Sequence, residues 1–142
     1  MSGNDALKLD HQLCFPLYAT SREVIKLYHA PLAKLGLTYT QYITMMVLWE
    51  EKKISVKDLG KRLYLDSGTL TPVLKTLEKE GYITRMRSPE DERILMVELT
   101  KDGEKLKQKA ADIPKEIGSC ISLSEQDAKD LYRILYSILN TI

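Results

Sequence analysis

The chain has 142 residues, a length typical of one compact domain with a substantial core. A hydrophobic content of 44% and a charged content of 29% fit a soluble globular protein, and no apolar run approaches a membrane span. The first residues carry no basic segment followed by an apolar one, so we expect no secretory signal. Two cysteines in such a chain favour a reducing cytoplasm, where thiols stay free, catalytic or redox-sensing.

Charge is unevenly distributed, although the net charge is only +1. Between Lys52 and Arg93, ten Lys or Arg side chains stand against seven Asp or Glu side chains. The rest of the chain has a slight acidic excess. A basic middle with weakly acidic ends indicates a central surface that faces phosphate.

Apolar residues recur at helical spacing between Leu9 and Tyr28, which predicts a first helix that Pro31 and Gly36 separate from the next. Residues 40–49 are apolar on most sides and predict a buried helix.

Capping signals mark the next two helices. Ser55-Val-Lys-Asp resembles a capping box and predicts a short helix through Leu63. Asp66 is a good N-cap for a longer helix that runs to Glu80 and stops at Gly81.

Residues 82–87 and 94–99 change to a strand-like pattern and flank the charged turn S-P-E-D-E-R, which predicts a two-stranded hairpin. Thr100 caps a further helix that extends to the region of Ser119, and Ser124 opens a final amphipathic helix. This order predicts a mainly α fold with a two-stranded β-wing, a winged helix-turn-helix. The terminal helices have nothing left to pack on, so we expect a second copy of the chain to bury them.

The start of the 66–80 helix carries small hydroxyl side chains where a recognition helix reaches DNA. Hydroxyl and backbone N–H groups there contact phosphates and base edges. Pro72 lies in the second turn, where its missing N–H costs little and its ring offers an apolar contact to a thymine methyl. The alternative is that Ser67 and Thr69 only assist helix capping. The candidate DNA contacts here are Ser67, Thr69, Thr71 and Pro72.

The hairpin supplies three arginines, and guanidinium groups at a wing tip can enter a narrow minor groove. Asp91 precedes Arg93 by two residues and can form an ion pair with it across the turn. We favour both roles, with Asp91 orienting Arg93 and Arg93 meeting DNA; a solvated charge run is the alternative. The candidate wing contacts are Arg85, Arg87, Asp91 and Arg93.

These motifs resemble the MarR family of dimeric winged-helix repressors. The resemblance is carried by L-D-S-G-T-L-T-P at 65–72, then L-K-x-L-E-x-x-G-Y-I-T-R, S-x-E-D-E-R and L-T-x-D-G in that order. At the amino end, L-C-F at 13–15 and L-Y-A-T-S-R-E at 17–23 resemble the OhrR branch, the organic-hydroperoxide sensors. The resemblance implies a homodimer that binds inverted-repeat, double-stranded operator DNA.

The resemblance places peroxide sensing on Cys14. In that branch two tyrosines of the partner subunit hold the sensing thiolate, and the matching positions are Tyr28 and Tyr39; Tyr18 matches a tyrosine near the oxidised sulfur. The thiolate attacks the peroxide O–O bond, and the sulfenic acid product must be trapped before it oxidises further. Cys120, between the last two helices, is in the right region to resolve Cys14 of the other chain. Ordinary burial remains the alternative for both thiols.

Pro16 decides where the first helix begins. In mid-helix it would free the carbonyl of Gln12, whereas it fits well in a first turn. We therefore predict a helix that starts near Cys14, where the helix dipole favours a thiolate. Metal binding is a weaker alternative, because only His11 and Cys14 share a face and a site needs three or four ligands.

We expect a cytoplasmic repressor rather than an enzyme, with no cofactor and no metal, released from its operator when an organic hydroperoxide oxidises Cys14. Within one compact domain, residues 1–39 would serve dimerisation and redox sensing, residues 40–99 DNA binding, and residues 100–142 dimerisation. One alternative is a MarR-type repressor released by a small phenolic or drug-like ligand in the dimer cleft. The other is a thiol peroxidase.

Overall fold

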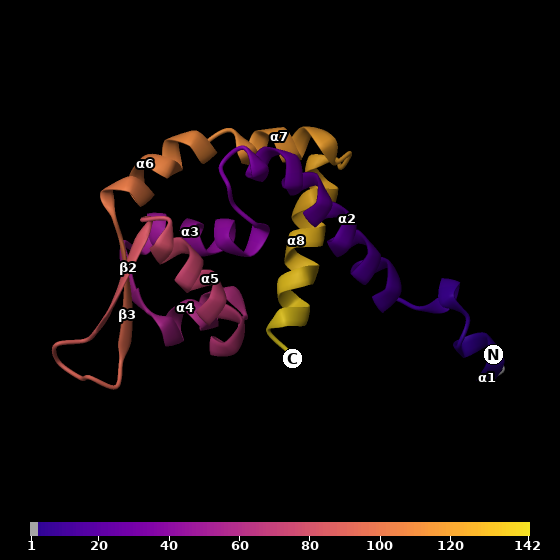
Figure 1. The fold of residues 1–142 in the computed structure, drawn as a ribbon. Helices are drawn as coiled ribbons and strands as arrows, with labels where there is room; N and C mark the ends of the chain where they lie inside the picture. The colour runs from indigo at the N-terminus through magenta and orange to yellow at the C-terminus, as the bar shows by residue number, and fades with distance from the viewer. Residues whose placement is uncertain (1–2) are drawn as a thin grey trace.

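The computed structural model describes residues 3–142, so the first two residues of the predicted 1–39 region lie outside it. A small sheet lies at one edge of a mostly helical subunit, and the winged helix-turn-helix is present as predicted (Figure 1). The elements are α1 (Gly3–Ala6), the 3₁₀ helix η1 (Leu9–His11), α2 (Cys14–Ala33), α3 (Tyr39–Glu51), β1 (Lys53–Ser55), α4 (Val56–Leu63), α5 (Ser67–Lys79), β2 (Ile83–Arg87), β3 (Leu95–Leu99), α6 (Lys101–Ala110), α7 (Ile113–Cys120) and α8 (Glu125–Leu139).

The first long helix, α2, begins at Cys14, and Pro16 lies in its first turn, as predicted. The prediction that Pro31 ends this helix is wrong. Pro31 is buried inside the last turn of α2, where its fixed φ fits the helix and only one backbone hydrogen bond is lost. The chain turns instead at Gly36, whose φ of 70° only glycine adopts without strain.

Side-chain caps fix the three helices of the DNA-binding region. The Ser55 hydroxyl accepts the N–H of Asp58, and the Asp66 carboxylate accepts the N–H of Thr69, so both predicted caps are confirmed. The start of α3 carries a full capping box between Thr38 and Gln41, which the sequence analysis missed. These caps set where each helix begins, and so which side chains stand at its exposed end.

The predicted hairpin forms, but a third strand joins it. The antiparallel sheet has the order β1-β3-β2, and Ile54 of β1 lies opposite Val97 of β3. The strand β1 has only three residues, the last of which is the Ser55 cap. It is too short to display the alternating pattern that identifies a strand in a sequence. This strand anchors the wing to the helical core.

The predicted helix from Thr100 to Ser119 is two helices, α6 and α7, with a break after Ala110. Pro114 causes the break. In a continuous helix its ring would clash with the carbonyl of Ala110, four residues earlier, and it has no N–H to donate to that carbonyl. The last helix, α8, opens at the Ser124 cap as predicted.

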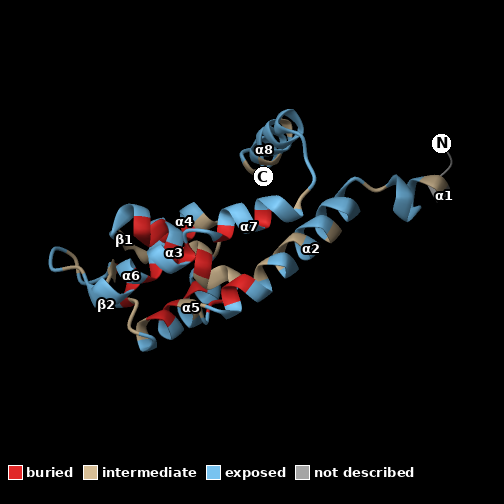
Figure 2. Cartoon of the chain, turned by 90° about the horizontal axis from the view of Figure 1, so that it is seen from above, coloured by how far each residue is buried: buried red, intermediate tan, exposed pale blue. Residues whose placement is uncertain are grey.

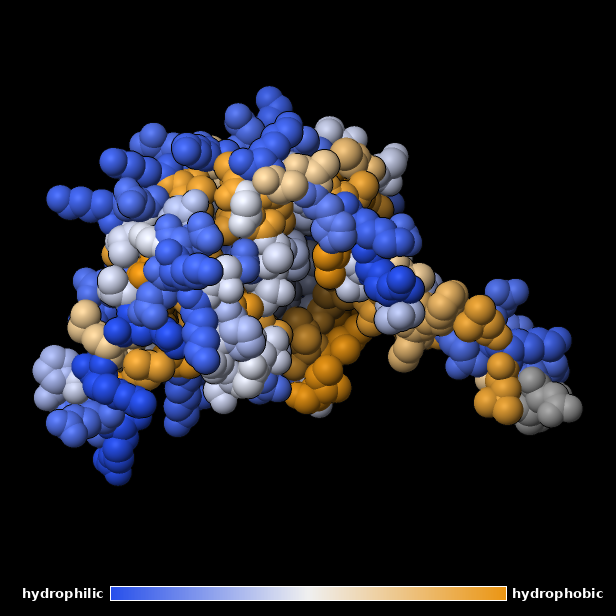
Figure 3. Space-filling view, viewed as in Figure 1, coloured by the Kyte–Doolittle hydropathy of each residue, from blue (hydrophilic) through white to orange (hydrophobic). Residues whose placement is uncertain are grey.

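The core lies among α3, α4, α5 and the sheet, while α8 and the first half of α2 stay largely exposed (Figure 2). No residue of α8 is buried, and none of the helices between residues 3 and 142 combines the length and apolar composition that crossing a membrane requires. Apolar surface therefore gathers near the amino end and on α8 (Figure 3). Its large members are Leu13, Phe15, Leu17, Tyr18, Leu131, Ile134, Tyr136 and Ile138. Such patches are typical of a subunit interface.

Replacing Gly60 by alanine should destabilise the fold, although alanine normally favours a helix. A Cβ at Gly60 would lie 2.6 Å from the backbone oxygen of Leu65, so the α4–α5 turn would have to move. We expect a loss of about 1–3 kcal/mol in the free energy of unfolding, measured by urea denaturation. The matched control is Gly118→Ala in α7, where nothing lies within 4 Å of the added carbon, and a gain of up to about 1 kcal/mol is expected. Equal effects of the two substitutions would contradict the close approach at Gly60.

Candidate nucleic-acid interface and thiol site

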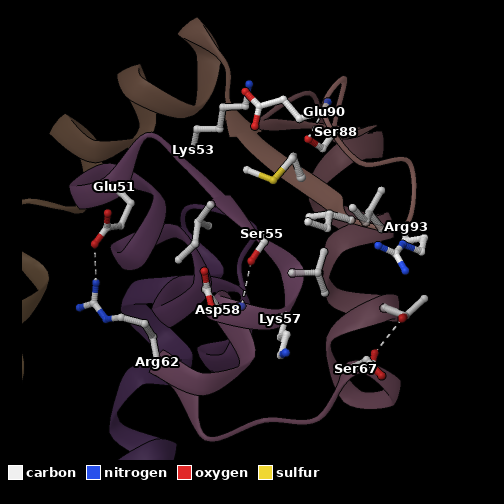
Figure 4. Close-up of a pocket in the computed structure, with 16 residues that line it drawn as sticks. Glu51, Lys53, Ser55, Lys57, Asp58, Arg62, Ser67, Ser88, Glu90 and Arg93 are labelled. Atoms are coloured by element: carbon white, nitrogen blue, oxygen red, sulfur yellow. Dashed lines mark hydrogen bonds and ion pairs between the residues drawn. The ribbon is translucent and has the colours of Figure 1, made fainter.

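A groove of about 940 Å³ lies between the starts of α4 and α5 and the wing (Figure 4). Eleven of its sixteen lining residues are polar or charged, and Lys57 of α4, Ser67 of α5 and Arg93 of the wing stand around the same hollow. A helix start and a wing tip that share one concave surface, with Lys57 and Arg93 on it, are suited to the phosphate backbone of a duplex.

The exposed end of α5 carries the predicted hydroxyl side chains. Asp66 caps the helix, and hydrogen bonds from the backbone and hydroxyl of Thr69 hold the pKa of its carboxyl below the usual range. The Thr71 hydroxyl donates to the carbonyl of Ser67, 2.7 Å away. Thr69 therefore takes part in the cap, as the alternative expected, whereas no hydrogen bond to the Ser67 hydroxyl is found within residues 3–142. All four candidates (Ser67, Thr69, Thr71 and Pro72) are exposed.

In the wing, Asp91 holds Arg93 in a fixed pose. The Arg93 backbone N–H and Nε both donate to one carboxylate oxygen at 3.0 Å, and a terminal nitrogen reaches the other oxygen at 3.1 Å. The Arg93 side-chain hydrogen bond lowers the pKa of the Asp91 carboxyl. The predicted ion pair is therefore confirmed, and because the Arg93 side chain is 90% exposed, its guanidinium stays available to an external anion.

Arg85 differs from the other two wing arginines. Its backbone N–H and its guanidinium both donate to the carboxylate of Glu78 on α5, and its side chain is only 20% exposed. This clasp fastens the wing to the recognition helix, and the sequence analysis missed it because Glu78 belongs to a different element. Arg87 is exposed, and no ion pair among the described residues involves it.

Arg62 is a second structural arginine that sequence reasoning did not single out. It bridges Glu50 and Glu51 at the end of α3, at 2.9 and 3.1 Å, and so ties α4 to α3. No motif marks the pair, since the partners lie eleven and twelve residues apart.

Both thiols lie at the surface of the subunit, so neither is ordinary core filling. Cys14 is the first residue of α2, where the first backbone N–H groups have no partner within the helix. Tyr28 lies on the same helix, about 21 Å further along at a rise of 1.5 Å per residue. One chain therefore cannot bring Cys14 to its own Tyr28. Cys120 is the last residue of α7, with its sulfur 3.4 Å from the carbonyl oxygen of Glu116.

The predicted tyrosines do come together. The rings of Tyr28 and Tyr39 lie 4.9 Å apart, and Tyr42, which the sequence analysis missed, lies 5.8 Å from Tyr28. Burial raises the pKa of each of these phenols, so they stay protonated and can donate O–H hydrogen bonds to a thiolate. Tyr18 stands apart on the first turns of α2, exposed, with the Arg22 guanidinium 5.4 Å above its ring.

The chain is similar to known transcriptional regulators. The sequence profile of the SarA/Rot transcriptional regulators matches residues 26–110. An organic hydroperoxide resistance transcriptional regulator of Bacillus subtilis strain 168 is 51% identical over 141 residues, covering 97% of this chain and 94% of that protein. The chain belongs to the MarR family, in its organic-hydroperoxide branch. Members of the MarR family are dimeric winged-helix transcriptional regulators, which agrees with the exposed apolar helices of this subunit.

Solved structures of AbfR from Staphylococcus epidermidis show a similar MarR-family subunit in several redox states. Reduced AbfR bound to DNA has a TM-score of 0.80 and 34% identity, covering 97% of this chain and 96% of that one. Overoxidised AbfR bound to DNA has a TM-score of 0.79 and 34% identity, covering 99% and 98%. Disulfide-formed AbfR has a TM-score of 0.66 and 35% identity, covering 96% of each chain. This subunit thus resembles the DNA-bound AbfR chains more than the disulfide-formed one.

The Glu78–Arg85 clasp should weaken in acid. The Arg85 hydrogen bond lowers the pKa of Glu78, so its stabilising effect is present above the pKa of an unfolded glutamate and is lost as the pH falls through the lower native value. Between pH 6 and pH 3 we expect hydrogen-exchange protection of the Arg85 amide to fall. In Glu78→Gln this fall in protection of the Arg85 amide should be absent. In the control Glu90→Gln, on the exposed wing tip, the protection should fall with pH as in wild type. The same profile in Glu78→Gln as in wild type would exclude the clasp as the cause.

Proposed function

We propose that the reduced homodimer represses transcription by binding an inverted-repeat operator, and that oxidation of Cys14 by an organic hydroperoxide releases it. The observation that carries this proposal is the geometry of α2: an exposed thiol begins the helix, and the tyrosine cluster suited to hold it lies one helix length away. Two antiparallel copies can meet this condition where one copy cannot. Such a regulator acts in the cytoplasm, beside its operator.

On the DNA side, the exposed start of α5 enters the major groove, with the two half-sites about one helical turn apart. Ser67, Thr69, Thr71 and Pro72 contact bases and phosphates there, and Arg87 and Arg93 reach the minor groove. Asp91 orients Arg93 through its carboxylate. Arg85 acts as a positioning residue, because its clasp with Glu78 sets the angle between the wing and α5.

On the thiol side, the Cys14 thiolate attacks one oxygen of the hydroperoxide. The S–O bond forms as the O–O bond breaks, sulfur gives up two electrons, and the leaving alkoxide takes a proton to become an alcohol. The helix start and the phenols of the partner's Tyr28 and the partner's Tyr39 stabilise the thiolate, and Tyr18 borders the oxidised sulfur. The Cys120 thiolate of the other chain then attacks the Cys14 sulfur, an S–S bond forms, and hydroxide leaves as water.

The disulfide, rather than the oxidised sulfur alone, is the releasing state in this proposal. AbfR was crystallised with DNA even when overoxidised, and its disulfide form is the one whose subunit differs more from this chain. A disulfide between subunits changes the relative position of the two subunits, whereas an oxygen added to the Cys14 sulfur changes only the surroundings of that sulfur. The oxidised state needs only to prefer the non-binding arrangement by a few kcal/mol.

Relatives of this chain are named transcriptional regulators, which supports a regulator over a thiol peroxidase. A peroxidase would turn over hydroperoxide with a thiol reductant and would show no sequence-specific DNA affinity. A repressor released by a phenolic ligand in the dimer cleft is distinguished by Cys14→Ser, which would leave its induction intact.

Arg87→Ala should weaken operator binding and reduce its salt dependence. Its exposed guanidinium has no internal carboxylate partner in the described chain, so removing one cation per subunit from the DNA interface should reduce the steepness of log K against log salt by about 1 per subunit. Fluorescence anisotropy titrations at several salt concentrations measure the slope. Lys115→Ala, an exposed charge on α7 away from the groove, should leave the slope unchanged. An unchanged slope in Arg87→Ala would remove Arg87 from the interface.

Cumene hydroperoxide should convert the wild-type protein to a covalent dimer and abolish operator binding. Cys14→Ser should resist both effects, because it lacks the nucleophile. Cys120→Ser should lose the covalent dimer on a non-reducing gel and retain DNA binding longer after oxidation. The two measurements are made on the same samples at one salt concentration. A covalent dimer that persists in Cys120→Ser would show that Cys120 is not the resolving thiol.

A further inference from the structure

The segment before α2 exposes three leucines that the proposed function does not use. Leu7 and Leu13 are each 84% exposed and Leu9 is 56% exposed. The segment is nevertheless ordered: the Gln12 side chain donates to the carbonyls of Ala6 and Lys8 at 2.7 and 2.8 Å. It projects away from its own subunit (Figure 1), so its leucines contact nothing extensive in the chain that carries them.

A pocket of about 380 Å³ lies between α3 and the α6–α7 junction. Its floor is formed by Tyr42, Trp49 and Ala110, which are all buried, and Met46 forms an exposed wall. The lining is mostly apolar; its charged members are Lys107 and Glu50, and Glu50 is already paired with Arg62. Volume and lining suit one or two aliphatic side chains rather than a nucleic acid.

We propose that the leucine segment 7–13 of one subunit docks into this pocket of its partner, with Leu9 as the anchor. The inference rests on the proposed function, which brings Cys14 to the partner's tyrosine cluster. From there the pocket is adjacent, since the Tyr42 ring lies 6.3 Å from Tyr39 and 6.4 Å from Trp49. Leu9 precedes Cys14 by five residues, a stretch that spans at most about 17 Å when fully extended and about 10 Å at the 3₁₀ rise that residues 9–11 adopt. The segment therefore reaches the pocket when Cys14 reaches the tyrosines.

Charge supports the same pairing. Asp10, in the middle of the segment, and Lys107, at the pocket, take part in none of the ion pairs found within residues 3–142. Docking brings groups of opposite charge together at the rim while Leu9 fills the apolar floor. The docked segment covers the reduced thiol with apolar surface, which admits hydrophobic peroxides and excludes water.

Disulfide trapping tests the contact directly. In a Cys14→Ser/Cys120→Ser background, copies carrying Leu9→Cys are mixed with copies carrying Met46→Cys, the exposed pocket wall, and oxidised mildly. We expect a covalent dimer that contains one copy of each kind, identified by mass spectrometry. The matched control replaces Met46→Cys by Lys75→Cys, exposed on α5, and should give none. Failure to form the 9–46 bond while gel filtration shows a dimer would overturn the proposal.

Trp49, the only tryptophan, provides a second readout without new cysteines. In the otherwise wild-type protein, Leu9→Asp should raise acrylamide quenching of Trp49 at least twofold, because the pocket loses its cover. Met86→Asp, a comparably exposed apolar site on the wing, should not. Equal quenching in wild type and Leu9→Asp would contradict docking. Neither experiment depends on peroxide, so a Cys14→Ser protein that still responds to peroxide would refute the proposed function and leave this contact to be judged separately.

Discussion

One buried hydrogen bond joins α3, in the helical core, to α6, which follows the wing. The indole N–H of Trp49, on α3, donates to the carbonyl oxygen of Gly103, on α6, across 2.8 Å. Gly103 itself packs against the backbone of Tyr82 at the base of the wing so closely that no side chain fits. Thr100 closes the same junction by donating its hydroxyl to the carbonyl of Gly81. Because an unpaired indole N–H would be costly here, α3, α6 and the wing keep one relative position.

This junction lies at one end of a continuous aromatic row. Tyr28, Tyr39, Tyr42 and Trp49 follow one another at ring spacings between 4.9 and 6.4 Å. The row begins where the proposed thiol site lies and ends at the base of the wing. Packed side chains with few voids do not deform gradually, so in the proposed mechanism a rearrangement at the tyrosines would reach the wing as a displacement of whole elements. The Glu78–Arg85 clasp then makes the wing and α5 move together.

Local signals in the sequence account for most of the helices. The caps at Ser55, Asp66, Thr100 and Ser124 each depend on residues three apart, and all four were predicted correctly. What escaped prediction depends on distant partners. The strand β1 exists because β3 lies beside it, and the Arg85 clasp exists because α5 returns to the wing. Pro31 and Pro114 carry the same local signal, yet one continues a helix and the other ends one, and only packing decides between them.

The candidate site was predictable as a list of residues but not as an arrangement. Cys14, Tyr28 and Tyr39 were named from the resemblance to a family, and the length of α2 then shows why one chain cannot unite them. A straight helix cannot fold back on itself. Cys14 can therefore meet a Tyr28 side chain only if that tyrosine belongs to α2 of a second subunit. The same constraint makes redox control effective. In the proposed mechanism, a sensing site shared between two subunits changes their relative position when it reacts, and that relative position sets the spacing of the two recognition helices on DNA.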